Sequence, residues 1–480
     1  MLQQNIILLA DSYKASHYAQ YPKGTSFVSS YIEARNTKNE MFRNVVFFGL
    51  QAFIKQYLLK PITQQDIDQA ADFFQKHAVP FYKEGWQYIL DKYQGKLPVT
   101  IQSLSEGTVS PIGTCLVQII NNDPQCYWLV SYLETALLRA VWYPSTIATL
   151  SFALKNVFKD AMEKSCDTLD KLPFMLSDFA PRGVSSNESS ILGGMAHTLS
   201  FAGSDNVAAV IAVHEYYNQP KDQVVAYSVP AAEHSTITSW TRSGEIDAYS
   251  NMIEQYGDGL FAVVSDSYDI YHAVNNIWGG VLKEKVESLK GTLVIRPDSG
   301  DPIKVLLGDD SSTDPLVKRG LFGIIEDKFG VTLNTKGYKL FPNYVRLIQG
   351  DGIDINSLPK IIEAILEKGY SLDNIVFGMG GGLLQQVNRD TIGWAMKCSA
   401  IKVNDTWIDV FKDPITSRAK VSKKGRLAVV YAQDKLQTVR VELAGTSDLL
   451  TDVYYNGKLL VDDSFSTIQQ RLNNRDYCSE

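Results

Sequence analysis

The chain has 480 residues, of which 45% are hydrophobic and 21% are charged, and both values are ordinary for a globular protein. This length predicts roughly three domain equivalents. The formal net charge of -7 argues against a general nucleic-acid binder, because such proteins are usually basic overall. The five cysteines are odd in number, far apart and without a CxxC pair, so neither a disulfide framework nor a zinc site is indicated. A reducing cytoplasm is the simplest setting.

The first residues contain a short apolar run, Ile6 to Ala10, which Asp11 and Lys14 interrupt at once. This run is too short for the apolar core of a signal peptide. No other stretch approaches the roughly 20 apolar residues that span a bilayer. We therefore expect a soluble, cytoplasmic protein that does not associate with membranes.

The N-terminal part, residues 1–145, has a mixed pattern. Its apolar residues predict strands at 5–10, 26–32, 100–102 and 114–119, and helices near 49–59, 65–77 and 125–140. Such a mixture does not suit a regular α/β repeat. We expect this part to belong to a separate α+β domain.

The central part, residues 146–390, repeats one theme from about residue 172 onward. A short apolar strand ends in polar or glycine residues, and a stretch long enough for a helix follows. Seven such strand ends occur, near residues 174, 199, 226, 262, 294, 347 and 376. Alternating strands and helices imply a parallel sheet, and strands punctuated this way over some 220 residues favour a TIM-like β/α barrel over a bundle. A doubly wound sheet is the alternative that periodicity leaves open.

In either fold, ligands bind at the carboxyl ends of the parallel strands. Turn chemistry alone could explain any single polar residue there, since Asp, Ser and Gly are favoured in turns and caps. Turn chemistry alone is a weaker explanation when all seven strand ends are polar. The pattern therefore predicts a ligand site on this face. The polar residues at these ends are Asp178, Asp205, Glu233, His234, Asp266, Asp298 and Asp351.

Glycines gather in NIVFGMGGGLLQQ (374–386), where a strand runs into Gly378 and glycines 380–382 before a helix. Backbone N–H groups in such a loop can approach an anion, and the helix N-terminus adds partial positive charge. The spacing fits neither GxGxxG nor a Walker loop, and a glycine-rich tight turn is the alternative. A similar loop at Gly350 and Asp351 follows the preceding strand, and two adjacent loops of this kind suit a phosphosugar site.

Carboxylates follow two further strands, Asp266 in VSDSYD (264–269) and Asp298 in RPDSGDP (296–302). They can bind ribose hydroxyls or magnesium held by phosphates, although Pro-Asp-Ser-Gly is also a good turn. His234 follows another strand at a predicted helix start. An imidazole with an intrinsic pKa near ~6.5 suits nucleophilic or proton-transfer chemistry, and capping the helix is the structural alternative.

The C-terminal part, residues 391–480, predicts short strands and turns between 395 and 465, then a helix and a frayed tail. We expect it to complete one mixed α+β domain together with residues 1–145. Basic residues gather around its start. The Lys-Lys-Gly-Arg run at 423–426 is typical of a solvated turn, whereas Arg389, Lys397 and Lys412 stand out because they are spaced out within apolar, strand-like sequence.

Together these segments resemble the nicotinamide phosphoribosyltransferases. The resemblance implies an enzyme of NAD salvage that condenses nicotinamide with 5-phosphoribosyl 1-pyrophosphate (PRPP) to nicotinamide mononucleotide and pyrophosphate. It also implies an irregular α/β barrel, a second domain built from both chain ends, and a homodimer with shared active sites. The match runs nearly end to end, through NIILLADSYKASHYAQYP (5–22), DPQCYWLVSYLET (123–135), DFAPRGVSS (178–186), YSVPAAEHSTIT (227–238), IRPDSGDP (295–302), FGMGGGLLQ (377–385), FKDP (411–414) and SKKGR (422–426).

The resemblance assigns residues to the pyridine base. It implies that Phe179 and Arg296 sandwich the ring, a task suited to an aromatic face and a planar guanidinium. It places Asp205 opposite the carboxamide, whose NH₂ needs an acceptor. The structural alternative is that Asp205 only caps the helix that begins near the following asparagine. Tyr13, with Asp11 nearby, matches the residue that closes the base pocket from the neighbouring subunit.

The resemblance also assigns residues to the phosphoribosyl side. It implies that ATP phosphorylates His234, and that Mg²⁺ arrives with pyrophosphate near Asp266 and Asp298. The phosphate and ribose contacts that it implies are Arg182, Gly350, Asp351, Gly380 and Gly381. The cations that it implies on the pyrophosphate side are Arg35, Arg389, Lys397 and Lys412.

Three positions depart from the animal enzymes of this family. Met175, Ala180 and Pro181 stand where those enzymes carry Lys, Gly and Tyr. These changes concern the channel beside the site rather than the core reaction. Two other functions stay open: nicotinate phosphoribosyltransferase, which shares the architecture, and a non-catalytic binding protein on the same fold.

Overall fold

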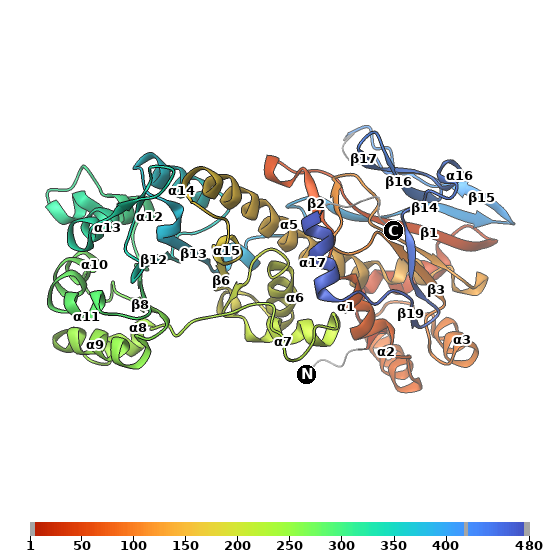
Figure 1. Ribbon diagram of the computed structural model, residues 1–480. Helices are drawn as coiled ribbons and strands as arrows, with labels where there is room; N and C mark the ends of the chain where they lie inside the picture. The colour runs from red at the N-terminus through yellow and green to blue at the C-terminus, as the bar shows by residue number, and fades with distance from the viewer. Residues whose placement is uncertain (1–4, 417–420, 475–480) are drawn as a thin grey trace. The chain divides into compact units, whose positions relative to one another are not determined.

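The computed structural model describes residues 5–416 and 421–474, and its chain divides into two compact units (Figure 1). The first unit comprises residues 1–149, 211–223 and 387–480, and the second comprises residues 150–210 and 224–386. Helices α5 (Glu134–Ser165) and α7 (Val207–Tyr216) each cross from one unit to the other. The domain boundaries expected at 145 and 390 stay a prediction.

The first unit contains a seven-stranded antiparallel sheet. Strands from the C-terminal part pair beside strands from the N-terminal part, so both ends of the chain build one sheet. The predicted strands at 26–32, 100–102 and 114–119 are confirmed as β1, β3 and β5. In sheet order the strands are β15 (Thr406–Asp409), β14 (Trp394–Val403), β1 (Thr25–Ala34), β5 (Val117–Asn121), β3 (Val99–Ser103), β18 (Thr451–Tyr455) and β19 (Lys458–Leu459).

The strand predicted at residues 5–10 is wrong. Ile6–Leu8 is a 3-10 turn instead, because the side chain of Asn5 accepts a hydrogen bond from the backbone N–H of Ile7 and caps it. A second 3-10 segment, Ser12–Ala19, follows directly. Both isoleucines of the turn are buried, so the apolar run serves the core in a helical rather than an extended form.

Short helices and two antiparallel two-stranded pairs complete the first unit. A capping box formed by Thr63 and Asp66 starts α2, and a π-helical turn, Ile54–Leu58, continues α1. The predicted C-terminal helix is confirmed, and the tail after residue 474 lies outside the described residues. The elements are α1 (Leu50–Phe53), α2 (Gln64–Lys76), α3 (Lys83–Tyr93), α4 (Leu129–Tyr132), α16 (Val441–Ala444), α17 (Phe465–Asn474), the pair β2 (Asn44–Val46) and β4 (Val109–Pro111), and the pair β16 (Leu427–Ala432) and β17 (Lys435–Arg440).

The second unit contains a six-stranded sheet in which all strands run parallel. Their carboxyl ends therefore lie along one edge, as the alternating pattern predicts. Six of the seven predicted strand ends are confirmed by these strands. In sheet order they are β7 (Gly203–Ser204), β6 (Leu176–Asp178), β13 (Ile375–Met379), β12 (Val345–Gln349), β9 (Thr292–Arg296) and β8 (Leu260–Val264).

The seventh strand, expected near residue 226, is not a regular strand. Only isolated parallel bridges form here, from Tyr227 to Gly203 of β7 and from Ala231 to Ala262 of β8. Pro230 has no N–H group to donate, so this segment cannot complete a ladder, although its carbonyl accepts from Ala262. Backbone pairing nevertheless continues from β8 through this segment to β7.

Helices cover the parallel strands, and Figure 1 shows α9, α10 and α13 on the outer side of β8 and β12. Inside, Ala262, Val294 and Ile348 form an apolar cluster against which Phe179 packs. The helices are α6 (Asn187–His197), α8 (His234–Thr238), α9 (Glu245–Tyr256), α10 (Ile270–His272), α11 (Lys283–Glu287), α12 (Pro302–Leu307), α13 (Pro315–Phe329), α14 (Ser357–Glu367) and α15 (Gly381–Leu384), and the short pair β10 (Thr332–Leu333) and β11 (Lys339–Leu340) lies between α13 and β12 in the chain.

No helix within residues 5–416 or 421–474 combines the length and the apolar character needed to span a bilayer. Four of the five cysteines lie in the same described part, and each is a free thiol.

Candidate active site

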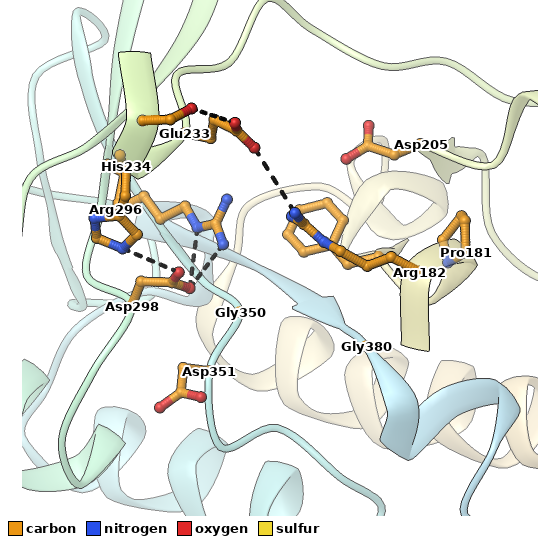
Figure 2. Close-up of a pocket in the computed structure, with 13 residues that line it drawn as sticks. Pro181, Arg182, Asp205, Glu233, His234, Arg296, Asp298, Gly350, Asp351 and Gly380 are labelled. Carbon is orange, nitrogen blue, oxygen red and sulfur yellow. Dashed lines mark hydrogen bonds and ion pairs between the residues drawn. The ribbon is translucent and has the colours of Figure 1, made fainter. Parts of the chain in front are cut away.

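A pocket of about 670 Å³ opens at the carboxyl ends of the parallel strands (Figure 2). This volume is typical of a site for a small-molecule ligand. The pocket lies wholly within the second unit, and its walls come from the loops that follow β6, β7, β9, β12 and β13 and from the start of α8, which follows the bridging segment 227–231. The lining residues are Phe179, Pro181, Arg182, Asp205, Glu233, His234, Ser235, Val264, Arg296, Asp298, Gly350, Asp351 and Gly380.

Phe179 and Arg296 lie together in this pocket. The guanidinium carbon of Arg296 is 5.5 Å from the centroid of the phenyl ring. The backbone N–H of Phe179 donates to the carbonyl of Met379 at 3.0 Å, which fixes the start of its loop. A planar ring between two planar groups requires them to be about 7 Å apart, so the guanidinium must shift by roughly 1–2 Å to admit one.

Arg296 is held by a carboxylate network. Its Nε and Nη2 atoms donate to Oδ1 of Asp298 at 3.2 and 2.7 Å. Oδ2 of Asp266 in turn accepts from the backbone N–H of Asp298 at 3.1 Å and from the hydroxyl of Ser299 at 2.6 Å. The other oxygen of Asp266, Oδ1, is buried and has no hydrogen-bond partner. An orphaned carboxylate oxygen of this kind can accept from a ligand or bind a cation.

His234 is the first residue of α8, as the sequence predicts, and its side chain is 46% exposed. Nε2 lies 3.6 Å from Oδ1 of Asp266 and 3.5 Å from Oδ2 of Asp298. Nδ1 lies 3.1 Å from the hydroxyl of Ser267. Two carboxylates around Nε2 favour a proton on that nitrogen, which leaves Nδ1 to accept from the serine. The N-cap residue of α8 is Glu233, so helix capping does not explain the presence of His234.

Arg182 lies on the other side of the pocket, on the turn Pro181–Gly183. Its guanidinium is 81% exposed and lies 3.7 Å from the carboxylate of Glu233, an interaction that Figure 2 marks. A side chain at Gly183 would approach the backbone nitrogen of Gly381 at 3.4 Å. The turn that carries Arg182 therefore adjoins the glycine loop after β13.

Asp205 follows β7, and Figure 2 shows its carboxylate on the same side of the pocket as Pro181 and Arg182. The hydroxyl of Ser228 donates to Oδ1 of Asp205. The helix that follows is capped by Asn206, whose Oδ1 accepts from Ala209 N–H at 3.2 Å. Capping therefore does not explain Asp205, and its carboxylate is exposed toward the pocket.

Gly350 and Asp351 line the pocket after β12. The side chain of Gln349 donates from Nε2 to the carbonyl of Asp351 at 2.7 Å and so holds the loop in place. The Asp351 carboxylate is exposed, and Figure 2 shows it at the opposite edge of the pocket from Asp205. Six strand-end loops thus present acceptors, cations and glycines to one cavity.

Comparison with known proteins fits this geometry. Residues 174–457 match the model of the nicotinate phosphoribosyltransferase (NAPRTase) family, and residues 5–101 match the N-terminal domain of nicotinamide phosphoribosyltransferase. A protein of Xanthomonas campestris pv. campestris (strain 8004) named nicotinamide phosphoribosyltransferase is 44% identical over 466 residues, which is 95% of each chain. The chain belongs to the nicotinamide phosphoribosyltransferase family. It is therefore an enzyme of the pentosyltransferase class.

More distant relatives agree with this assignment. A nicotinamide phosphoribosyltransferase of Acinetobacter baylyi (strain ATCC 33305 / BD413 / ADP1) is 31% identical over 491 residues, covering 96% of each chain. The nicotinate-nucleotide pyrophosphorylase structure from Pyrococcus furiosus is similar with a TM-score of 0.61 at 15% identity, covering 99% of this chain and 96% of that one. The structure of human nicotinic acid phosphoribosyltransferase is similar with a TM-score of 0.54 at 16% identity, covering 98% of this chain and 93% of that one. These two structures show a shared α/β fold.

A second group of residues that the family resemblance assigns to ligands lies in the first unit. Burial lowers the pKa of Lys397, Glu134 opposes this, and the charges of Arg35, Lys14 and Arg389 lower the pKa further. These four cations therefore share one electrostatic environment. The buried ammonium of Lys14 forms an ion pair with Glu134. The structure thus gathers three of the four predicted pyrophosphate-side cations, Arg35, Arg389 and Lys397, within the first unit.

The remaining residues assigned in the first unit are exposed. Tyr13 is 58% exposed and makes an edge contact with the ring of His17. Asp11 accepts a hydrogen bond of 2.8 Å from the hydroxyl of Thr135. Lys412 is exposed. Its backbone N–H donates to the hydroxyl of Ser422, and its carbonyl accepts from the backbone N–H of Ser422.

Several residues of the pocket or next to it are not predicted as site residues from the sequence. Glu233 is recognised there as a strand-end residue but receives no role, and Ser235 and Val264 are not singled out. Ser228 and Ser267, which contact Asp205 and His234, are also missed. Serines near strand ends are common turn residues, so nothing in the sequence separates these two from the rest.

The three departures from the animal enzymes have different positions. Met175 and Ala180 are fully buried, whereas Pro181 lines the pocket. Of the three, only Pro181 therefore changes the surface that a ligand meets here.

Proposed function

We propose that this enzyme condenses nicotinamide with PRPP to nicotinamide mononucleotide and pyrophosphate, as a step of cytoplasmic NAD salvage. The observation that carries the choice of base is Asp205 at the pocket wall. An ionised carboxylate accepts a hydrogen bond from the carboxamide NH₂ and repels the carboxylate of nicotinate. The names of the relatives support the same activity.

The reaction forms a bond from the pyridine nitrogen to the anomeric carbon and breaks the bond from that carbon to pyrophosphate oxygen. Phe179 and Arg296 would hold the ring by its two faces, and Asp205 would fix its rotation through the carboxamide. Holding a weak nucleophile in line lowers the entropic part of the barrier. Arg182 and the adjoining glycine loop would bind the ribose 5-phosphate, because exposed N–H groups and a guanidinium suit a phosphate.

Within the described part of the chain, no three His, Cys, Asp or Glu side chains are grouped to hold a metal ion by themselves. Magnesium bound by pyrophosphate needs fewer protein ligands, because phosphate oxygens and water complete its octahedron. The unpartnered Oδ1 of Asp266 and the nearby Oδ2 of Asp298 are oxygen ligands of the required kind. We propose that these two carboxylates face the magnesium, which would neutralise charge on the departing pyrophosphate.

We further propose that ATP phosphorylates His234 at Nδ1, and that the phosphate stabilises the arrangement that captures substrate. The nitrogen would displace ADP from the γ-phosphate, and the two carboxylates at Nε2 would stabilise the charge left on the ring. Ser267 would orient the ring before the transfer, and its hydroxyl would leave Nδ1 as the bond to phosphorus forms.

His234→Ala is expected to abolish nicotinamide-dependent ATP hydrolysis and to raise the KM for nicotinamide by about tenfold or more. Synthesis without ATP should persist, because pyrophosphate is already a good leaving group. The measurements are ADP release and acid-labile phosphate on the protein. Unchanged ADP release by the variant would assign the histidine a structural role instead.

We propose that the parallel sheet is an irregular TIM-like barrel closed by residues 227–231, and that both chain ends form the second, mixed domain. The bridges from this segment to β7 and β8 support the closure. We also propose a homodimer in which Tyr13, Arg35, Arg389 and Lys397 of one subunit serve the pocket of the other. The cations of the first unit support this, since Lys397, Arg35 and Arg389 share one electrostatic environment there.

Mixing Tyr13→Ala protein with Asp298→Ala protein tests the shared sites. Each variant alone should retain less than about 1% of kcat/KM, because each loses a group in every site. Mixed dimers carry one intact site, so subunit exchange should restore activity toward a quarter of the wild-type value. A monomer that is fully active in sedimentation experiments would contradict this arrangement.

Nicotinate phosphoribosyltransferase is the second candidate, because one family model that matches the chain carries that name. Pyrophosphate release measured with nicotinamide and with nicotinate, each with and without ATP, separates the two. Preference for nicotinamide, stimulated by ATP, is expected. A higher kcat/KM with nicotinate would replace the proposed function by the second candidate.

A further inference from the structure

Two buried polar side chains, Asp178 and Asn206, join the loops that carry Phe179 and Asp205. Asp178 ends β6 and directly precedes Phe179, and Asn206 directly follows Asp205 after β7. Asp178 is 0% exposed and Asn206 is 1% exposed. Neither residue lines the pocket, yet each is the chain neighbour of a residue that does.

The carboxylate of Asp178 accepts one hydrogen bond on each oxygen. Oδ1 accepts from the backbone N–H of Ala180 at 2.8 Å, which shapes the turn around Phe179. Oδ2 accepts from Nδ2 of Asn206 at 3.0 Å. In addition, the backbone carbonyl of Asp178 accepts from the N–H of Asp205 at 3.0 Å. A single residue therefore contacts both loops.

Asn206 is itself anchored to two helices. Its Nδ2 also donates to the carbonyl of Ser190 in α6 at 2.9 Å, and its Oδ1 caps α7 through Ala209. A Cβ atom at Gly194 of α6 would lie 2.5 Å from this Nδ2, so the amide packs directly against the helix backbone. The partner of Asp178 is thus held in a fixed place.

We propose that the Asp178–Asn206 pair is a positioning element that sets the distance between Phe179 and Asp205. Phe179 meets the face of the pyridine ring and Asp205 meets its carboxamide edge, so this distance decides which base fits. The inference rests on the proposed function for the chemical identity of the base.

A positioning role explains why the buried residue 178 is an aspartate rather than a neutral residue. Burial raises the pKa of Asp178 to about 6, and the nearby charge of Asp205 adds to this. A buried carboxylate is costly to ionise, and stability alone would favour a neutral residue. Both neighbours of its oxygens are N–H donors, however, so the ionised form is the better acceptor for each, whereas the protonated form adds a donor. An asparagine here would turn its NH₂ toward one donor in either orientation.

Two variants test the pair. Asp178→Asn places an amide N–H against a donor, and Asn206→Ser keeps a residue that caps helices well while removing the bridging amide. In both variants the KM for the base should rise by about tenfold or more, because a hydrogen bond to a charged group is lost. The KM for PRPP and kcat should change less, and the preference for nicotinamide over nicotinate should shrink.

Ser151→Ala is the matched control. It removes another buried hydrogen bond of the same unit, from Ser151 to Nδ1 of His197 at 3.0 Å, but touches neither loop. It should lower the melting temperature while leaving both KM values and the base preference unchanged. Asn206→Ser provides a second reading if Asp178→Asn fails to fold.

Wild-type protein is assayed first with both bases, and the variants are then assayed with the base that it prefers. A wild-type preference for nicotinate would overturn the proposed function alone. A folded Asn206→Ser variant with an unchanged KM for the preferred base would overturn the positioning role alone. The same rise in that KM for Ser151→Ala would also overturn it, because general loss of stability would then explain the effect.

Discussion

Gly378→Ala is expected to raise the KM for the pyridine base by on the order of 100-fold, since it disrupts both phenyl-ring packing and base stacking. A Cβ atom at this position would lie 2.0 Å from Cε2 and 2.2 Å from Cδ2 of Phe179. Gly378 cannot retreat, because it lies inside β13 and pairs with Ser177 of β6. The phenyl ring must therefore move, and the space open to it is the pocket that the base would occupy.

Gly259→Ala is the control for this prediction. A Cβ atom there would meet only the carbonyl of Tyr256, at 4.0 Å, and the residue lies before β8 at the far end from the pocket. It should leave kcat and both KM values within a factor of about two, because surface substitutions of this kind cost little. Steady-state kinetics and thermal melting of both variants provide the comparison. Wild-type KM values for Gly378→Ala would mean that the phenyl ring does not contact the base.

Much of the site could be predicted from sequence because its residues follow the carboxyl ends of parallel strands. A parallel sheet brings all its carboxyl ends to one edge, so Asp205, His234 and Asp298 meet there although they are far apart in sequence. Periodicity could not show that residues 227–231 form bridges rather than a strand. Pro230 decides that outcome locally, because its missing N–H breaks the ladder.

Pairs that span two strand ends could not be predicted. The bonds from Ser228 to Asp205 and from Asn206 to Asp178 depend on how β6, β7 and the bridging segment are placed side by side. That register is a property of the folded sheet and leaves no local pattern in the sequence. The turn at Ile6 shows the reverse case, where one side-chain cap from Asn5 overrides an apolar run typical of a strand.

The grouping of cations in the first unit also could not be predicted from sequence. Lys397 belongs to β14, and its neighbours Arg35 and Lys14 come from the other end of the chain. The antiparallel pairing of β1 with β14 brings Arg35, which directly follows β1, to the same end of the pair as the start of β14. Sequence spacing could indicate that each was unusual within apolar surroundings, but it could not indicate that they would lie in one electrostatic environment.

Asp205→Asn is expected to reverse or abolish the preference for nicotinamide over nicotinate. In the proposed function the wild-type carboxylate would accept from the carboxamide NH₂, and a hydrogen bond to a charged group contributes about 1.5–3 kcal/mol. Its loss should lower kcat/KM for nicotinamide by about 10- to 100-fold. The same change removes a like charge opposite nicotinate, so kcat/KM for nicotinate should rise.

The structure sharpens this experiment, because the neighbours of Asp205 fix the orientation of the new amide. Ser228 donates its hydroxyl to the side chain of residue 205, so an asparagine would turn its oxygen to that serine and its NH₂ to the base. A donor would then face the carboxamide NH₂ of nicotinamide but suit the carboxylate of nicotinate. Folding should be preserved, since α7 is capped by Asn206 and the backbone N–H of Asp205 keeps its bond to Asp178. Both bases are compared by kcat/KM at saturating PRPP, with melting temperature as the check on folding. If the ratio of the two values stays at the wild-type level in a folded variant, Asp205 does not select the base, and the case for nicotinamide loses its main structural support.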